Sequence, residues 1–358
     1  MPGWAGPPPL LIAVTVLGIL VAPAVSRADA GGSPPDRAVA TASLVAGEPP
    51  AAPAAPGGSG TPTGPTTRPS APLPGTGSAG ESAGGTAGRA VAPQPEPRVV
   101  GIATFNQYVD LDTDAAIEDA LSITSRPGVS VIGWQEGFSA GPVYQLLAKR
   151  GWATKRYVAT KGARELAVSW RKDEFALAGS VLHKLADGVA EGDGRYPFGT
   201  RYALRVTLRD RTSGERLSVI DTHLPQRVED LDNPGTWNDT KNAIRASRQL
   251  AGLTDIWRQA PGRWVVGTGD YNIAALADQR ARNDGGVVAA YAGIARSSYS
   301  LLGFADVDPT HPVSGRFIDY VHVARPDLES GRVELVSQRT QRGLNSDHRP
   351  LVVRMRLS

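Results

Sequence analysis

The run Ser346-Asp347-His348-Arg349-Pro350 places an acid beside a histidine, just before a final apolar stretch from Leu351 to Val353. Neither side chain enters an apolar core cheaply, because each buried polar group needs a partner. An imidazole titrates near neutral pH, so His348 suits proton transfer or stabilisation of transition-state charge. Asp347 could orient a reactant or a metal-bound water. The alternative is a surface turn closed by a local aspartate hydrogen bond and ended by Pro350.

Six further polar residues stand at the end of an apolar run, just past it or inside it: Asn106, Glu136, His223, Asp270, Asn272 and Asp319. If these runs are strands that share one edge, the polar side chains converge with Asp347 and His348. Carboxylates, carboxamides and imidazoles gathered in one cleft suit a hard divalent cation and a phosphate.

Each of these residues also has a purely structural interpretation. Asn106 and Asn272 could be turn residues, and Asp270 could cap a helix. Glu136 could be a surface acid, and His223 a hydrogen-bonded core histidine. All of these structural interpretations would have to be correct at once, for residues that follow one another in this order along the chain. A shared site is the more economical explanation.

The elements that would position these residues follow from hydrophobic periodicity. Strands are predicted at residues 98–105, 129–134, 165–170, 174–182, 202–208, 216–222, 263–267, 317–323, 333–337 and 351–357, and helices at 113–124, 142–150 and 238–257. The strands at 165–170 and 174–182 are expected to pair, and those at 202–208 and 216–222 to form a hairpin. The pattern predicts an α+β fold, with two sheets packed face to face and helices outside. The longest helix would bury Ile244, Leu250, Ala251, Leu253 and Trp257.

The N-terminal 97 residues differ in composition from the rest. Residues 1–30 combine a short apolar run with the pattern Ala28-Asp29-Ala30, which predicts a cleaved export signal. No Lys or Arg precedes Arg27, so an uncleaved membrane anchor is the alternative. Residues 31–97 are rich in Pro, Ala, Gly, Ser and Thr, and this composition predicts a disordered linker. We therefore expect a secreted or cell-surface protein.

Residues 98–358 are long enough for one large domain with a single core. The chain has no cysteine, which in an exported protein excludes disulfide bridges and thiolate metal sites. Its formal net charge of +3 is far from the basic excess of a dedicated nucleic-acid binder.

Seven short motifs follow one another along this domain: Thr104-Phe105-Asn106, Val131-Ile132-Gly133-Trp134-Gln135-Glu136, Ser169 to Phe175, Thr222-His223-Leu224, Gly269-Asp270-Tyr271-Asn272, Arg316-Phe317-Ile318-Asp319-Tyr320 and Ser346 to Pro350. In sequence and order they resemble the motifs of the endonuclease/exonuclease/phosphatase superfamily, which includes DNase I-like nucleases, inositol polyphosphate 5-phosphatases and neutral sphingomyelinases. Each motif is short, but the series covers the whole of residues 98–358. Trp134 stands where the family usually has Leu, which should affect packing more than chemistry.

The resemblance implies a four-layer αββα sandwich, as in DNase I, and a phosphoesterase that depends on Mg²⁺, or alternatively Mn²⁺. Glu136 would be the main metal ligand, assisted by Asn106 and Asp347. Arg201 is a candidate phosphate contact.

The resemblance also implies roles for the remaining polar residues. Asp270 would orient or deprotonate the attacking water, and Asn272 would hold that water and a phosphate oxygen. His223 and His348 would contact the scissile phosphate, and Asp319 would fix the tautomer of His348.

The substrate stays open at this level. A nuclease or phosphatase, acting on phosphodiester or phosphomonoester bonds, is the leading hypothesis, with nucleic acid among the candidate partners. The alternatives are a lipid phosphodiesterase of sphingomyelinase type and a non-catalytic binding protein on the same scaffold. Three predicted loops, 186–200, 225–236 and 279–309, would select the substrate. No stable protein partner is implied, and a monomer is expected.

Overall fold

A computed structural model describes residues 96–188, 199–281 and 286–358. The predicted signal segment (1–30) and all but the last two residues of the predicted linker (31–97) lie outside these ranges. So does most of the predicted loop 186–200. Within the described ranges, every helix is too short or too polar to cross a membrane.

Two six-stranded mixed sheets form the centre of the domain. The first sheet has the order β11 (Val333–Thr340), β12 (Leu351–Leu357), β1 (Arg98–Asn106), β2 (Val131–Gln135), β4 (Ala167–Arg171) and β3 (Trp152–Arg156). The second has the order β5 (Phe175–Ala186), β6 (Arg201–Asp210), β7 (Arg216–His223), β8 (Trp264–Asp270), β10 (Asp319–Ala324) and β9 (Ala295–Ser297).

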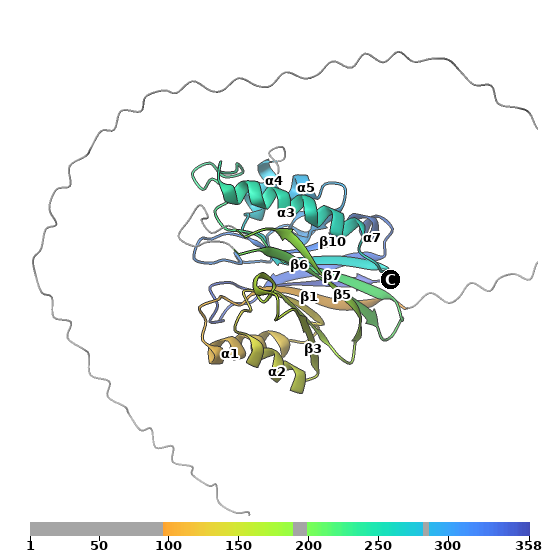
Figure 1. The fold of residues 1–358 in the computed structure, drawn as a ribbon. Coiled ribbons are helices and arrows are strands. Elements are labelled where there is room, and N and C mark those ends of the chain that lie inside the picture. Colours follow the sequence, from red (N-terminus) through yellow and green to blue (C-terminus); the bar gives the residue numbers. More distant parts are fainter. Residues whose placement is uncertain (1–95, 189–198, 282–285) are drawn as a thin grey trace, which may run out of the picture. The chain divides into compact units, whose positions relative to one another are not determined.

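Helices cover the outer face of each sheet, so the domain has four layers (Figure 1). The first sheet carries α1 (Thr113–Thr124) and α2 (Gly141–Lys149), and a 3₁₀ turn (η1, Lys161–Ala163) precedes β4. The second carries α3 (Lys241–Arg258), α4 (Ala275–Ala281), α5 (Val287–Ala290), α6 (Ser298–Leu302) and α7 (Arg325–Glu329). Figure 1 shows α1 and α2 on one side of the paired sheets and α3, α4 and α5 on the other. The predicted two-sheet sandwich is confirmed.

The two inner faces form one apolar core with a polar centre. Asp221 on β7 is fully buried, and its Oδ1 accepts hydrogen bonds from Gln135 Nε2 (2.6 Å) and Thr268 Oγ1 (2.8 Å). Burial raises the pKa of Asp221 well above its usual value. The sheets approach so closely here that a Cβ at Gly133 would lie 2.0 Å from Thr268 Oγ1, which is why only glycine fits. This contact joins β2 to β7 and β8 and fixes how the two sheets meet.

Trp134 fits its position by packing, as expected. The indole is fully buried and donates a hydrogen bond from Nε1 to Ser169 Oγ at 2.9 Å. Its ring also lies edge-on to Phe105 and Tyr144, which ties β2 to β1 and α2.

Several predicted details are wrong. β4 and β5 do not pair, because the chain crosses from the first sheet to the second between them. Ile244 is 51% exposed, since the buried side of α3 runs through Ala243, Ala246 and Leu250 instead. The predicted loop 279–309 contains α5, β9 and α6.

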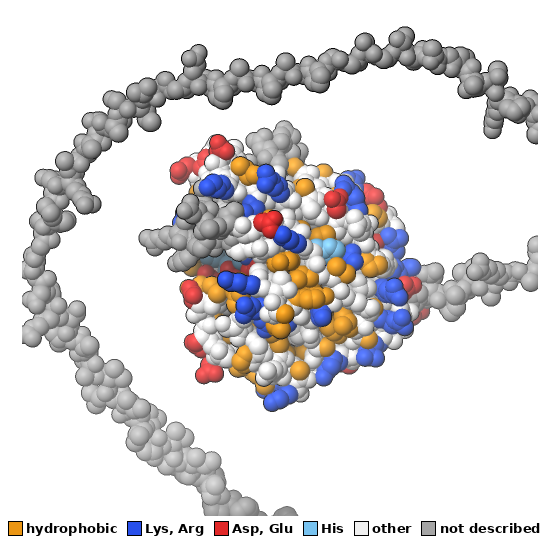
Figure 2. Space-filling model, in the orientation of Figure 1, with side chains coloured by type: hydrophobic (Ala, Val, Ile, Leu, Met, Phe, Trp, Pro, Cys, Tyr) orange, Lys and Arg blue, Asp and Glu red, His pale blue; other side chains and the backbone are white. Residues whose placement is uncertain are grey.

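Surface charge is mixed on the face shown in Figure 2. Lys and Arg side chains lie among acidic and hydrophobic ones. This face therefore presents separate basic patches and no continuous basic stripe across its described residues.

Candidate active site

Strand register brings the predicted site residues to one edge. β7 and β8 are parallel with His223 opposite Asp270, and β10 is antiparallel to β8 with Asp319 opposite Asp270. Three neighbouring strands thus place one histidine and two acids side by side. In the first sheet β1 and β2 are also parallel, and both end at this edge, with Asn106 opposite Gln135.

Asn106 joins the two sheets at the site. Its Nδ2 donates to Asp270 Oδ2 (3.0 Å) and to Glu136 Oε1 (3.1 Å), so one amide group lies between two carboxylates. Its oxygen accepts the backbone N–H of Tyr108 at 2.9 Å. In this arrangement Asn106 orients both acids. The sequence predicts Asn106 as a metal ligand. For that role its amide group would have to rotate so that the oxygen, and not Nδ2, faces the carboxylates.

Glu136 directly follows β2 and is held at its backbone and at both carboxylate oxygens. Its φ of 57° lies in the left-handed region, which is unusual for a residue with a side chain. Oε2 accepts the backbone N–H of Val109 at 2.8 Å, while Oε1 faces Asn106 and lies 3.8 Å from His223 Nε2. Such local strain is typical of functional residues that the surrounding structure holds in place.

His348 and Asp319 lie together as the resemblance implies. Asp319 Oδ2 is 2.8 Å from His348 Nδ1, and both side chains are buried. Burial alone would lower the pKa of His348, but the charge of Asp319, its hydrogen bond and the charge of Asp270 raise that pKa to about 10. The imidazole is therefore protonated at neutral pH and points Nε2 toward Asp270 Oδ2, 3.8 Å away.

The loop before β12 is anchored by α1. Asp119 is buried, and its carboxylate accepts the backbone N–H groups of Asn345 (2.8 Å) and Ser346 (2.9 Å). Ser346 Oγ in turn donates to Asn106 O and accepts the backbone N–H of His348. Asp119 was not predicted as a site residue, because in the sequence an acid on an amphipathic helix is indistinguishable from an ordinary surface residue.

His223 has a carboxylate partner that the sequence analysis missed. Its Nδ1 lies 2.9 Å from Glu165 Oε2. Both carboxylate oxygens of Glu165 also accept hydrogen bonds from Arg201 Nη1, Oε1 at 2.5 Å and Oε2 at 2.6 Å. Burial alone would raise the pKa of Glu165, but the charges of Arg201 and His223 lower it to about 2. Burial likewise opposes charging of His223, yet the charge of Glu165 outweighs it and raises the histidine pKa.

Arg201 lies next to the carboxylate that holds His223. Its guanidinium pairs with Glu165 and lies 3.4 Å from Nδ1 of His223, the ring nitrogen bonded to Glu165. From this position Arg201 orients Glu165, which in turn holds Nδ1 of His223. A direct phosphate contact by Arg201 is not what the geometry favours.

Asn272 is held over His223 by two loops. It has φ 53°, its Nδ2 donates to Leu224 O (3.1 Å), and the same nitrogen is 3.3 Å from His223 Nε2. Arg316 pairs with Glu229 and donates to the backbone oxygen of Asn272 at 2.8 Å. Glu229 and Arg316 were not predicted as site residues, although Arg316 opens one of the quoted motifs.

Asp347 lies beside a third histidine. Its Oδ2 is 3.7 Å from His311 Nε2, and among the described residues it takes no part in the hydrogen bonds that join Asn106 to Glu136. Within residues 96–188, 199–281 and 286–358, two groups have ligand atoms close enough for a cation: His311, Asp347 and His348, and Asp270, Asp319 and His348. The oxygen donors of Glu136, Asp270 and Asp347 have the chemistry that Mg²⁺ prefers.

Comparison with known proteins defines the class of fold. No family model and no curated protein sequence matches this chain. Among solved structures, an endonuclease/exonuclease/phosphatase from Bacteroides vulgatus superposes with TM-score 0.51 and 16% identity over 73% of this chain and 100% of that one. A family member from Bacteroides thetaiotaomicron gives TM-score 0.52 and 13% identity over 74% and 97%.

D. rerio TDP2, solved with a single-stranded DNA product, gives TM-score 0.51 and 15% identity over 72% of this chain and 98% of its own. The chain thus has the endonuclease/exonuclease/phosphatase fold, as its motifs predicted.

Proposed function

We propose that this protein is a metal-dependent phosphoesterase. The observation that carries the proposal is the position of Asp270 between two imidazoles. Its Oδ2 lies 3.6 Å from His223 Nε2 and 3.8 Å from His348 Nε2. Each imidazole has its own carboxylate behind it, Glu165 and Asp319 respectively. An acid flanked by two histidines, each oriented by its own carboxylate, suits activation of water next to an anionic phosphate.

The residues divide the chemistry between them. Asp270 would orient the attacking water and accept its proton. His348, protonated and fixed by Asp319, would stabilise charge on the phosphate or protonate the leaving oxygen. His223 and Asn272 would bind the remaining phosphate oxygens, with Glu165 and Arg201 holding His223 in place.

Mg²⁺, or Mn²⁺, when bound would neutralise phosphate charge and act as a Lewis acid. Glu136 fits as the main ligand of the metal ion. Its Oε1 and Asp270 Oδ2 both accept the amide of Asn106, so two carboxylates lie close together and favour a positive charge between them. Asp347 is a candidate for a second carboxylate contact.

Nucleic acid or a small phosphate ester is the substrate that we favour. The comparison with TDP2, which holds a single-stranded DNA product, supports a nucleic-acid substrate. The formal net charge of +3 argues for a short or single-stranded ligand over a long duplex, since duplex binding needs many phosphate contacts.

Export remains part of the proposal. The pattern Ala28-Asp29-Ala30 predicts a mature chain that begins near Gly31. N-terminal sequencing of protein recovered from the medium tests this, and an intact Met1 in the membrane fraction would favour the anchor.

The proposal is tested by a panel of substrates assayed with Mg²⁺, with Mn²⁺ and with excess chelator. The panel contains single-stranded DNA, duplex DNA, RNA, sphingomyelin, and simple phosphate monoesters and diesters. We expect hydrolysis of at least one class, lost with chelator and restored by Mg²⁺. Hydrolysis of sphingomyelin alone would identify the lipid alternative. Binding without hydrolysis of any member would favour the non-catalytic scaffold.

A further inference from the structure

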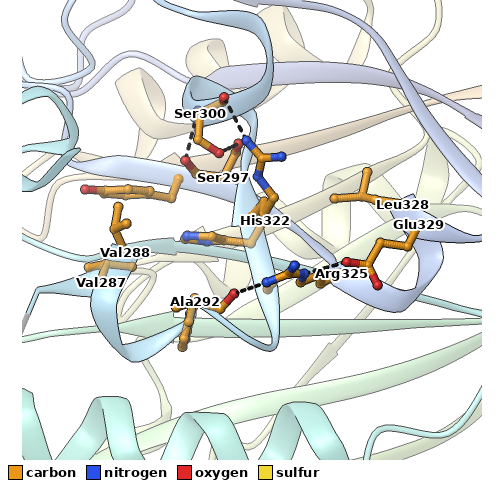
Figure 3. Close-up of a pocket in the computed structure, with 13 residues that line it drawn as sticks. Val287, Val288, Ala292, Ser297, Ser300, His322, Arg325, Leu328 and Glu329 are labelled. Carbon is orange, nitrogen blue, oxygen red and sulfur yellow. Dashed lines mark hydrogen bonds and ion pairs between the residues drawn. The ribbon is translucent and has the colours of Figure 1, made fainter. Parts of the chain in front are cut away.

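A cavity separate from the candidate site lies on the outer face of the second sheet. It has a volume of about 520 Å³ and is lined by β10, α5, α7 and the segment from Ala295 to Ser300. Figure 3 shows Val287, Val288 and Leu328 around its apolar wall, with His322 at the centre. The volume is that of a small-molecule site and far exceeds an ordinary packing defect.

His322 is the unusual residue of this cavity. It is only 2% exposed, and among the described residues its Nδ1 has no hydrogen-bond partner. Burial lowers the pKa of His322 to about 3, so the ring is neutral. A neutral imidazole carries one N–H donor and one lone pair, and leaving such groups buried without partners is costly.

The other polar groups around the cavity already have partners. The hydroxyl of Tyr291 bonds to that of Tyr271 (3.1 Å), and the hydroxyl of Tyr320 donates to Ile273 O (2.9 Å). Arg325 bonds to Glu329 and to Ala292 O. Figure 3 shows these last contacts as dashed lines. Of the described residues that line the cavity, His322 is therefore the one with a buried side-chain atom that has no hydrogen-bond partner.

We propose that this cavity binds a small planar aromatic molecule that carries one N–H or O–H group, with that group donating to His322. The aromatic surroundings favour a flat ligand. His322 lies parallel to Tyr320 at 5.1 Å, and Tyr291 meets its ring edge-on at 5.0 Å. The apolar wall favours burial of a ring, and the single acceptor selects for one donor.

The cavity is separate from the catalytic edge but shares β10 with it. Side chains alternate along a strand, so Asp319 faces His348 while Tyr320 and His322 face the cavity. Tyr320 also packs on Tyr271, which stands between Asp270 and Asn272 in the chain. A ligand here would contact the opposite face of the strand that orients His348.

Indole and indene are suitable probes, because they have nearly the same shape and only indole has an N–H donor. Binding to the full chain can be measured by calorimetry and ligand-observed NMR. We expect indole to bind about tenfold more tightly than indene, the effect of one buried neutral hydrogen bond. His322→Phe keeps a flat ring but removes the acceptor, and should reduce indole affinity to that of indene. His183→Phe, which removes an imidazole from β5 outside the cavity, should change neither affinity.

A second variant tests the place of binding without touching His322. Ala292 lines the mouth of the cavity and is exposed, so Ala292→Trp should fill it and abolish binding of both probes while the domain stays folded. Equal affinities of indole and indene, unchanged indole binding in His322→Phe, or no binding of indole to the parent at millimolar concentration would each overturn the proposal. The last result would mean that the cavity holds only water.

Discussion

The carboxylate of Asp119 accepts the backbone N–H of Ser346 at 2.9 Å, two residues before His348. The same side chain accepts the backbone and side-chain N–H groups of Asn345. A buried acid on α1 thus positions the loop that brings the histidine to the candidate site, without contacting the histidine itself.

Asp119→Asn should displace this loop. The amide keeps one acceptor but turns a second one into a donor that faces backbone N–H groups. We expect kcat to fall about tenfold or more, KM to change little, and the free energy of unfolding to fall by about 1–3 kcal/mol. Steady-state kinetics and thermal unfolding measure these effects. Asp114→Asn, an exposed acid in the first turn of the same helix, should change neither; equal loss in both variants would show that Asp119 has no special role.

Asp319→Asn should change the pH dependence of turnover. The active His348 is expected to be protonated, and Asp319 helps to hold its pKa at about 10. Without that charge the pKa falls, so the basic limb of the pH–rate profile moves to lower pH and kcat falls about 10²-fold. The raised pKa also stabilises the folded state below pH 6.5, and this stabilisation is lost as the pH rises toward 10. The variant should therefore lose less stability than the parent over that interval.

The control for Asp319→Asn must be an exposed acid. Asp327, which its place beside Pro326 suggests as a turn residue, is unsuitable: it lies in α7, is buried, and accepts the backbone N–H of Val265 and the guanidinium of Arg332. Asp306→Asn is the better control, because Asp306 is exposed in the loop before β10. An unshifted profile with near-normal turnover in Asp319→Asn would make that acid structural.

Arg201→Gln distinguishes a supporting role from a phosphate contact. If Arg201 supports His223 through Glu165, kcat should fall about tenfold at nearly constant KM. The domain should also lose about 3–5 kcal/mol of stability, because a buried carboxylate loses its ion-pair partner. A raised KM with unchanged kcat would instead support the hypothesis that Arg201 contacts the phosphate directly. Arg164→Gln, at an exposed neighbour, is the matched control.

Glu136→Gln should weaken metal activation without unfolding the domain. The amide keeps the size of the side chain but removes the charge that would hold Mg²⁺. We expect activity at limiting Mg²⁺ to fall about 10²-fold and the thermal midpoint to change little. Asp110→Asn, an exposed acid in the loop between β1 and α1, should follow the parent titration curve. A parental rate at limiting Mg²⁺ in Glu136→Gln would refute its assignment as ligand.

The strands and their polar ends were predictable because burial imposes a visible pattern. The stretch Leu351–Leu357 was predicted to the residue, and so was the helix at 113–124. The position of Asp319 next to His348 followed from its motif.

Other features depend on contacts that periodicity does not encode. Glu165 precedes β4, and its pairing with His223 depends on the two sheets packing together, across 58 positions of sequence. Nor does a pattern of apolar residues identify the neighbour of a strand, which is why β4 and β5 were paired wrongly. His322 lies in an apolar strand like any core residue, and only the three-dimensional structure shows that its Nδ1 has no hydrogen-bond partner among the described residues.

The pairing of β1 with β12 joins the two ends of the domain, with Arg98 opposite Leu357. The candidate site is also divided, because Asn106, Glu136 and His348 come with the first sheet and His223, Asp270 and Asp319 with the second. Contacts so distant in sequence form late and slowly, since loop closure must come first. During refolding, hydrolytic activity should therefore return only in the slowest phase, after the helical circular dichroism signal has recovered.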